Sequence, residues 1–213
     1  MRSYFGRINL SWADKYLFEG NIRRDGSSRF HKNHRWGTFP SFSLGWRISE
    51  ENFLKSVKWI NMMKLRFSWG ALGNNAVDNY EYQSVYNKDN YILGNAVMQG
   101  LAQTQLANAM VSWETTYVTN IGLDFNLFGS KLDGTIDVFN KDTRDILIDL
   151  PAPLLVGNAS IPTQNAARVR NKGIEMNLKW NHKIGKVDYF VGGNFTFIDN
   201  EVTCFKGEER SIT

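Results

Sequence analysis

The sequence predicts an all-β protein, an antiparallel up-and-down segment of a transmembrane β-barrel, and three observations lead to this prediction. Apolar and polar residues alternate over about eight separate segments, which is the period of a β-strand. One face of every segment lacks charged residues, whereas the other face carries them. Short and long connections alternate along the chain. Together these features favour strands that meet lipid on one face and water on the other.

The alternating segments follow one another through the whole chain. In the first of them, Tyr4, Ile8 and Trp12 share one face, and Arg7 and Asn9 share the other. The eight segments are residues 4–12, 16–23, 36–48, 62–70, 117–127, 132–139, 174–180 and 187–197. The connections between them are residues 13–15, 24–35, 49–61, 71–114, 128–131, 140–172 and 181–186.

Aromatic residues gather at both ends of the predicted strands, as in the two aromatic girdles of an outer-membrane barrel. Trp36 and Trp46 lie on one predicted strand, and their separation corresponds to about 33 Å at a rise of roughly 3.3 Å per residue. A strand tilt of about 40° reduces this length to roughly 25 Å, the height of the apolar band of such a barrel. A strand of a soluble sandwich, about 17–20 Å long, does not need this length.

One connection departs from the alternation. In residues 49–61, Ser49 precedes two glutamates, and Phe53, Leu54 and Val57 follow at helical spacing. A serine N-cap followed by acidic residues and an apolar stripe predicts a short amphipathic helix near residues 50–60.

The composition excludes several classes of function. The net charge of +4 arises from 25 basic and 21 acidic residues spread along the chain, which argues against nucleic acid as a partner. Cys204 is the single cysteine, and the three histidines do not form a zinc motif. A GxSxG nucleophile elbow and a phosphate-binding glycine loop are also missing. The sequence therefore predicts no enzyme, no cofactor site and no metal site.

Four ordered motifs resemble the barrel region of SusC/RagA-type TonB-linked (TonB-dependent) outer-membrane transporters. They are RRDGSSRF at 23–30, RWGTFPSFSLGWRISEENF at 35–53, LRFSWGALGN at 65–74 and VRNKGIEMNLKW at 169–180. The resemblance implies a 22-stranded barrel in the Gram-negative outer membrane, closed by an N-terminal plug. It also implies import of oligosaccharides or peptides with a SusD-like lipoprotein as lid, driven by the TonB, ExbB and ExbD complex.

We expect structural roles for the residues that carry these motifs. They are Arg23, Asp25, Gly26, Ser27, Ser28, Arg29, Phe30, Trp36, Pro40, Gly45, Trp46, Arg47, Asn171, Gly173 and Glu175. The plug, the TonB box and a signal peptide are not recognisable, so we expect residues 1–213 to be an internal part of the barrel domain that does not form a pore alone. The alternative is a soluble, secreted, β-rich carbohydrate-binding module.

The basic stretch before residue 36 allows two interpretations. Its arginines are residues that can hold an anionic substrate in a bidentate manner, namely Arg23, Arg24, Arg29 and Arg35. The favoured interpretation is a hairpin end, with a turn set by Asp25 and Gly26, where glycine permits a positive φ and the arginines pair with neighbouring acids.

The connection 71–114 is rich in tyrosine and asparagine. Its tyrosines are predicted to stack on sugar rings, and they are Tyr80, Tyr82, Tyr86 and Tyr91. The alternative is that this connection packs only on other loops or on the lipoprotein lid.

Overall fold

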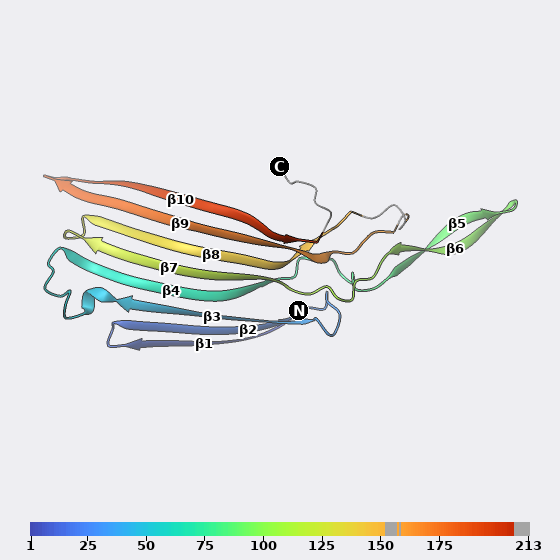
Figure 1. Cartoon of the computed structure of the whole chain (residues 1–213), viewed down its shortest axis with the longest axis horizontal. Helices are drawn as coiled ribbons and strands as arrows, with labels where there is room; N and C mark the ends of the chain where they lie inside the picture. Colours follow the sequence, from blue (N-terminus) through green and yellow to red (C-terminus); the bar gives the residue numbers. More distant parts are fainter. Residues whose placement is uncertain (152–156, 158, 207–213) are drawn as a thin grey trace.

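β-Strands make up most of the structure, a computed structural model that describes residues 1–151, 157 and 159–206 (Figure 1). The strands are β1 (Arg2–Trp12), β2 (Tyr16–Gly26), β3 (Trp36–Arg47), β4 (Ile60–Asn74), β5 (Val85–Leu93), β6 (Ala96–Gln105), β7 (Glu114–Leu127), β8 (Leu132–Ile148), β9 (Gln164–Ile184) and β10 (Val187–Phe205). One short 3₁₀ helix, η1 (Ile48–Glu50), follows β3. No helix in the described ranges is long and apolar enough to cross a bilayer.

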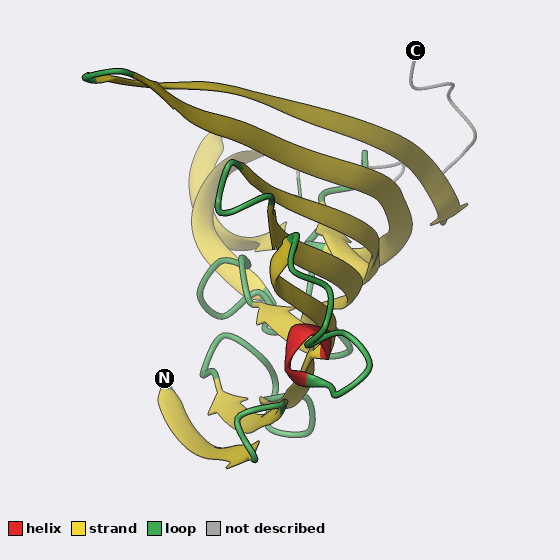
Figure 2. Ribbon diagram, turned by 90° about the vertical axis from the view of Figure 1, so that its left-hand side faces the viewer, coloured by secondary structure: helices red, strands yellow, loops and turns green. Residues whose placement is uncertain are grey.

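Eight of the strands form one antiparallel sheet in the order β1-β2-β3-β4-β7-β8-β9-β10. The sheet is strongly curved (Figure 2). Within the described residues, β1 and β10 each pair on one side only, so the sheet is open. The predicted fold class, about eight up-and-down strands of a barrel wall, is confirmed.

The strand register keeps the two predicted faces separate across the whole sheet. Tyr16 lies opposite Trp46, and Phe67 lies opposite Ile121. We call this side the apolar face. Its large side chains are exposed, and they include Tyr4, Ile8, Leu10, Trp12, Ile22, Leu44, Leu65, Ile121, Val138, Ile174, Val191, Phe195 and Phe197. The other side, which we call the polar face, carries the charged residues of the alternating pattern.

The strands reach further toward the long connections than the sequence predicts. Residues 140–172 are expected to be a connection, but β8 continues to Ile148 and β9 begins at Gln164. The expected boundary is wrong because backbone pairing continues where the apolar alternation ends. Polar pairs such as Thr116 with Thr143 and Arg168 with Asp142 link the strands there instead.

The connection 71–114 contains secondary structure that the sequence does not predict. Strands β5 and β6 pair as a separate hairpin that projects from the end of the large sheet (Figure 1). Gly94 in its turn has a φ of +64°, a conformation that favours glycine. A two-stranded hairpin is only marginally stable by itself, and both of its faces are exposed to solvent here.

The amphipathic helix predicted near residues 50–60 is wrong. The helix stops after η1, because Glu51 adopts an extended backbone (φ −78°, ψ 145°). The Glu51 carboxylate accepts hydrogen bonds from Lys15, Tyr16 and Trp46, and these bonds hold the chain against the β1–β2 turn. Successive turns follow instead of a helix, and Phe53 of the predicted apolar stripe remains exposed.

Buried apolar side chains gather where the long connections fold back over the end of the sheet. This loop cluster consists of Phe30, Phe39, Ala71, Val77, Val111 and Trp113. Phe30 and Val111 are fully buried, and the Phe30 and Trp113 rings are 5.3 Å apart. Connections that are distant in sequence are therefore fixed against one another at this end.

Candidate functional site

The polar face is held by an arginine that bridges three strands. Arg66 of β4 donates from Nε to both carboxylate oxygens of Asp124 on β7, at 2.9 and 2.8 Å. Its Nη2 donates to both carboxylate oxygens of Asp137 on β8, at 3.1 Å. Asn120 donates a further bond to Asp137, at 2.8 Å. One guanidinium therefore holds two carboxylates in place, and the three side chains form a fixed structural group on the polar face.

A glycine makes this three-strand bridge sterically allowed. Gly122 lies between the two partners in register, opposite Arg66 on one side and Asp137 on the other. A Cβ at this position would lie 2.6 Å from Arg66 Nη2 and would also overlap the Asp137 carboxylate. Because Gly122 has no side chain, the Arg66 side chain can cross β7 at this position and reach Asp137 on β8. The sequence shows the charges on one face, but only the register shows which of them meet.

The stretch RRDGSSRF builds a fixed connection. Arg23 Nε donates to both oxygens of the buried Asp25, at 2.9 and 2.7 Å. The Ser27 hydroxyl accepts bonds from the Arg29 amide and the Asn75 side chain. Arg29 Nη1 donates to the Asn75 carbonyl, at 3.1 Å. Ser28 is exposed, whereas Phe30 lies in the loop cluster. These contacts support the structural interpretation of Arg23 and Arg29.

Glycine is required at position 26 for a different reason from the one that the sequence suggests. It does not set a turn with a positive φ but continues β2 as its last residue. Trp36 lies opposite Gly26 in register, and a Cβ on Gly26 would lie 2.9 Å from two carbons of the indole ring. Glycine is therefore needed because the Trp36 ring covers this position. The turn itself comprises residues 27–35, closed by a bond from the Ser27 amide to the Arg35 carbonyl.

Pro40 lies just before the β3–β4 ladder, and Gly45 lies within it, opposite Arg66. The ladder begins at the Ser41–Gly70 pair, so Pro40 lies just outside it. A proline lacks a backbone N–H, and Pro40 is paired on one side only, with Ile22 of β2, so its missing donor is tolerated. A Cβ on Gly45 would lie 3.1 Å from the Lys64 side chain. Both residues thus fit the architecture of the sheet.

The short-turn end of the sheet is organised around Glu51. Tyr16, Lys15 and Trp46 donate to its carboxylate at 2.7, 3.0 and 3.2 Å. These hydrogen bonds, with that from Tyr16 contributing most, lower the pKa of Glu51 from 4.5 to about 2. Arg47 adds a backbone bond from its amide to the Lys15 carbonyl, at 2.8 Å. The loop after β3 is therefore held onto the neighbouring hairpin.

The motif VRNKGIEMNLKW lies on β9. Asn171 accepts a hydrogen bond from the Asn200 side chain of β10. Gly173 lies beneath the ring of Phe139, whose Cζ would be 2.6 Å from a Cβ added there. Glu175 lies opposite Asp137 in the β8–β9 register. Asn171 and Gly173 therefore fit close contact between neighbouring strands.

The four tyrosines proposed to bind substrate do not lie together. Tyr80 and Tyr82 form a pair with ring centroids 6.3 Å apart, and His31 contacts Tyr82 edge-on at 6.0 Å. Tyr86 and Tyr91 lie on β5, where the strand period places them on opposite faces of the hairpin. Tyr80, Tyr86 and Tyr91 are all more than half exposed. Their role in substrate binding stays a prediction.

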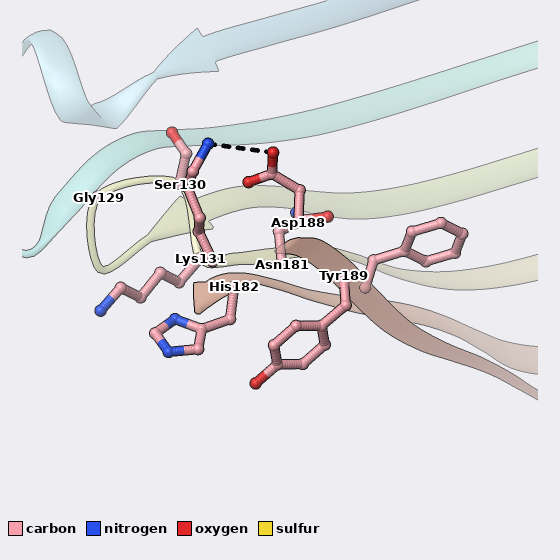
Figure 3. Close-up of a pocket in the computed structure, with 9 residues that line it drawn as sticks. Gly129, Ser130, Lys131, Asn181, His182, Asp188 and Tyr189 are labelled. Atoms are coloured by element: carbon pink, nitrogen blue, oxygen red, sulfur yellow. Dashed lines mark hydrogen bonds and ion pairs between the residues drawn. The ribbon is translucent and has the colours of Figure 1, made fainter. Parts of the chain in front are cut away.

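A shallow pocket of about 560 Å³ lies at the short turns, away from these tyrosines (Figure 3). It is lined by the β7–β8 turn and by the adjacent ends of β9 and β10, with Lys131, Asn181, His182 and Tyr189 among its residues. The His182 and Tyr189 rings meet edge-on at 5.7 Å, and Asp188 pairs with Lys183 at 3.1 Å. The ion pair is exposed, so the pocket is a surface feature of the turn end and not a buried site.

Comparison with known proteins gives one consistent result. The sequence model of the family described as TonB dependent receptor-like, beta-barrel matches residues 1–211. The chain is 38% identical over 210 residues to a TonB-dependent receptor of Formosa agariphila, covering 98% of this chain and 20% of that protein. It is 37% identical over 215 residues to the TonB-dependent receptor SusC of Bacteroides thetaiotaomicron, covering 98% of this chain and 21% of SusC.

Solved structures agree with the sequence comparison. The RagAB peptide importer in its closed-closed state contains a chain that matches with a TM-score of 0.86 and 29% identity. The match covers 95% of this chain and 22% of the importer chain. The siderophore receptor PirA of Pseudomonas aeruginosa shares the fold at 11% identity, with a TM-score of 0.59.

The similar proteins are receptors and transporters rather than enzymes, and the chain spans about a fifth of their length. The family match extends over almost the whole chain, and the sheet shows the up-and-down strand order expected for a barrel wall. The chain therefore belongs to the β-barrel family of the TonB-dependent receptors, within the SusC- and RagA-like group of outer-membrane transporters.

Proposed function

We propose that this chain supplies part of the barrel wall of an outer-membrane TonB-dependent transporter that imports oligosaccharides or peptides. The SusD-like lipoprotein lid and the TonB–ExbB–ExbD complex are its proposed partners. In this arrangement the apolar face contacts outer-membrane lipid and the polar face lines the lumen. The long connections face the cell exterior, and the short turns face the periplasm.

The observation that carries this proposal is the exposed apolar face. Residues such as Ile8, Ile121 and Phe195 are each more than half exposed, and the strand register places them on one continuous surface. An apolar surface of this extent causes aggregation in water but is the normal surface of a protein in lipid. It therefore disfavours the alternative of a soluble carbohydrate-binding module.

The two open edges of the sheet lead to an expectation for the chain in isolation. Backbone groups of β1 and β10 have no strand on their outer side within the described residues, and unpaired groups cost several kcal/mol each in lipid. We therefore expect the 213-residue chain alone not to form discrete single-channel conductances after refolding. Reproducible single-channel conductance steps of one size would contradict this expectation.

A chimera tests the proposal directly. In this chimera, the chain replaces the matching segment of the RagA barrel, about a fifth of that protein. We expect the chimera to reach the outer membrane, to co-purify with the RagB lipoprotein and to import a labelled peptide. As a matched control, the same segment with the order of its strands shuffled keeps the composition and destroys the register. A chimera that is retained as aggregate, like the shuffled control, would refute the proposal.

A further inference from the structure

Charged residues on the apolar face are confined to one end of the strands. At the short-turn end this face carries no Asp, Glu, Lys or Arg in the described residues, and its side chains include Trp12, Trp46, Trp180 and Tyr189. At the long-connection end the same face of β1 and β2 carries Arg2 and Arg24, just beyond the apolar band. The lipid-facing surface is therefore asymmetric in charge.

The two arginines lie beside the stacked rings of Tyr4 and Trp36, which we call the aromatic shelf. The Arg24 guanidinium carbon lies 5.3 Å from the centroid of the Trp36 ring, and Tyr4 stacks on Trp36 at 6.0 Å with an interplanar angle of 24°. The indole can lie flat there because Gly26 has no side chain. Arg2 lies opposite Gly26, diagonally next to Arg24, which corresponds to a backbone separation of about 7–8 Å.

The positive charge of this shelf is not compensated by the protein. In the part of the chain that the structure describes, neither Arg2 nor Arg24 pairs with a carboxylate within 4 Å, and the apolar face of β1–β3 carries no acid. The adjacent Arg23, on the polar face, is paired with Asp25 at 2.7 Å.

At the same long-connection end, the basic residues on the apolar face of β8–β10 have acidic partners. There, Arg170 lies opposite Glu201 and Lys172 lies opposite Asp199 in the β9–β10 register. Arg168 and Arg144 both bond to Asp142. Each of these basic residues thus bonds to a carboxylate or lies opposite one, unlike Arg2 and Arg24 on β1 and β2.

We propose that Arg2 and Arg24 bind the phosphate group of a phosphorylated lipid in the leaflet around the long-connection end. A guanidinium binds phosphate oxygens in a bidentate manner, and its attraction for them is stronger next to hydrocarbon than in water. The apolar band directly below the shelf, including Ile8 and Ile22, provides a surface for the acyl chains of the same molecule. A free phosphate shares the head-group chemistry but gains nothing from this band, so continuity of the two surfaces favours the lipid.

The inference rests on the proposed function for its membrane placement. The test uses the RagA chimera, reconstituted into phosphatidylcholine vesicles that contain phosphatidic acid and then extracted into a mild detergent. Native mass spectrometry counts the phosphatidic acid that each protein retains. Replacing both arginines, Arg2→Gln with Arg24→Gln, is expected to reduce this retention about tenfold, because two charge-assisted contacts are lost.

Arg7→Gln is the matched control, because it removes the same charge from the opposite face of β1, where the Arg7 side chain is 62% exposed. Retention in this variant is expected to stay within about twofold of the unmodified chimera. Arg24→Lys, which keeps the charge but not the planar fork, is expected to give an intermediate loss and remains informative if the double variant does not fold. Equal retention in all variants, or an equal loss with Arg7→Gln, would overturn the proposal.

Inorganic phosphate distinguishes the two sources of the head group. If millimolar phosphate displaces the lipid completely, the site binds phosphate and the lipid assignment is wrong. Peptide import is measured in parallel in cells that express the same chimeras. A chimera that imports peptide without retaining the lipid refutes this inference alone, whereas lipid retention without import argues against the proposed transport function alone.

Discussion

Arg66 offers the sharpest test of how the barrel wall is stabilised. We consider Arg66→Met in the RagA chimera, a change that keeps most of the side-chain volume and removes the guanidinium. Asp124 and Asp137 then lie side by side on the polar face without the cation that both contact in the structure. The loss is therefore that of two ion pairs together with the repulsion between two carboxylates.

The magnitude follows from the burial of the three side chains. Their exposed fractions are 32% for Arg66, 21% for Asp124 and 19% for Asp137. Exposed ion pairs contribute about 0–1 kcal/mol, whereas breaking a buried pair costs about 3–5 kcal/mol. Because the burial of this group is intermediate, we expect Arg66→Met to lower the free energy of unfolding by about 2 kcal/mol. This corresponds to roughly a thirtyfold change in the equilibrium constant.

The assay is urea unfolding of the chimera in lipid vesicles, followed by tryptophan fluorescence and by the electrophoretic shift of the folded band. The matched control is Arg7→Met on the same polar face, because Arg7 is 62% exposed and lies 3.8 Å from Glu19. We expect this control to change the unfolding free energy by less than about 0.5 kcal/mol.

A second comparison separates the loss of the two ion pairs from the cost of leaving two carboxylates without a cation. Combining Arg66→Met with Asp124→Asn and Asp137→Asn removes every charge of the group, and most of the lost stability is expected to return. The reasoning is refuted if Arg66→Met and Arg7→Met have equal effects, or if the neutral triple variant is as unstable as Arg66→Met alone.

Three further predictions concern the turn loop, a strand contact and the loop cluster. Glu51 has a folded-state pKa of about 2, below its ordinary 4.5, so its stabilising bonds are complete above about pH 5 and weaken as the pH falls toward 2. Hydrogen exchange of residues 48–57, corrected for intrinsic rates, is expected to accelerate over this range in the chimera but to be pH-independent in Glu51→Gln. Gly173→Ala places a Cβ against the Phe197 carbonyl and is expected to lower the yield of folded protein severely, whereas Gly193→Ala on the next strand, where the space is open, is expected to leave it unchanged; equal yields would contradict this. Phe30→Ala removes a fully buried ring, at about 3–5 kcal/mol locally, and is expected to make residues 27–35 and 75–83 sensitive to protease while the folded band persists; unchanged protease resistance would show that the loop cluster does not hold these connections.

The membrane strands were predictable because their pattern is local. Each strand has its own alternation, and Trp36 and Trp46 mark the height of the apolar band within a single segment. The hairpin β5–β6 was not predictable in this way. Its two faces mix polar and apolar residues, since the projecting hairpin packs neither face on the sheet. The helix near residues 50–60 was predicted wrongly because the bonds that hold Glu51 come from Lys15 and Tyr16, far away in the sequence.

By itself, the sequence determined that the chain forms antiparallel strands with one face for lipid, since strand period and side-chain polarity are properties of neighbouring residues. It also placed Arg66, Asp124 and Asp137 on the same face. Only the tertiary structure decided that these three meet across Gly122, and that Gly26 is needed beneath Trp36 rather than in a turn. Both outcomes depend on the register between strands, which backbone pairing and side-chain packing set together and which no single segment contains.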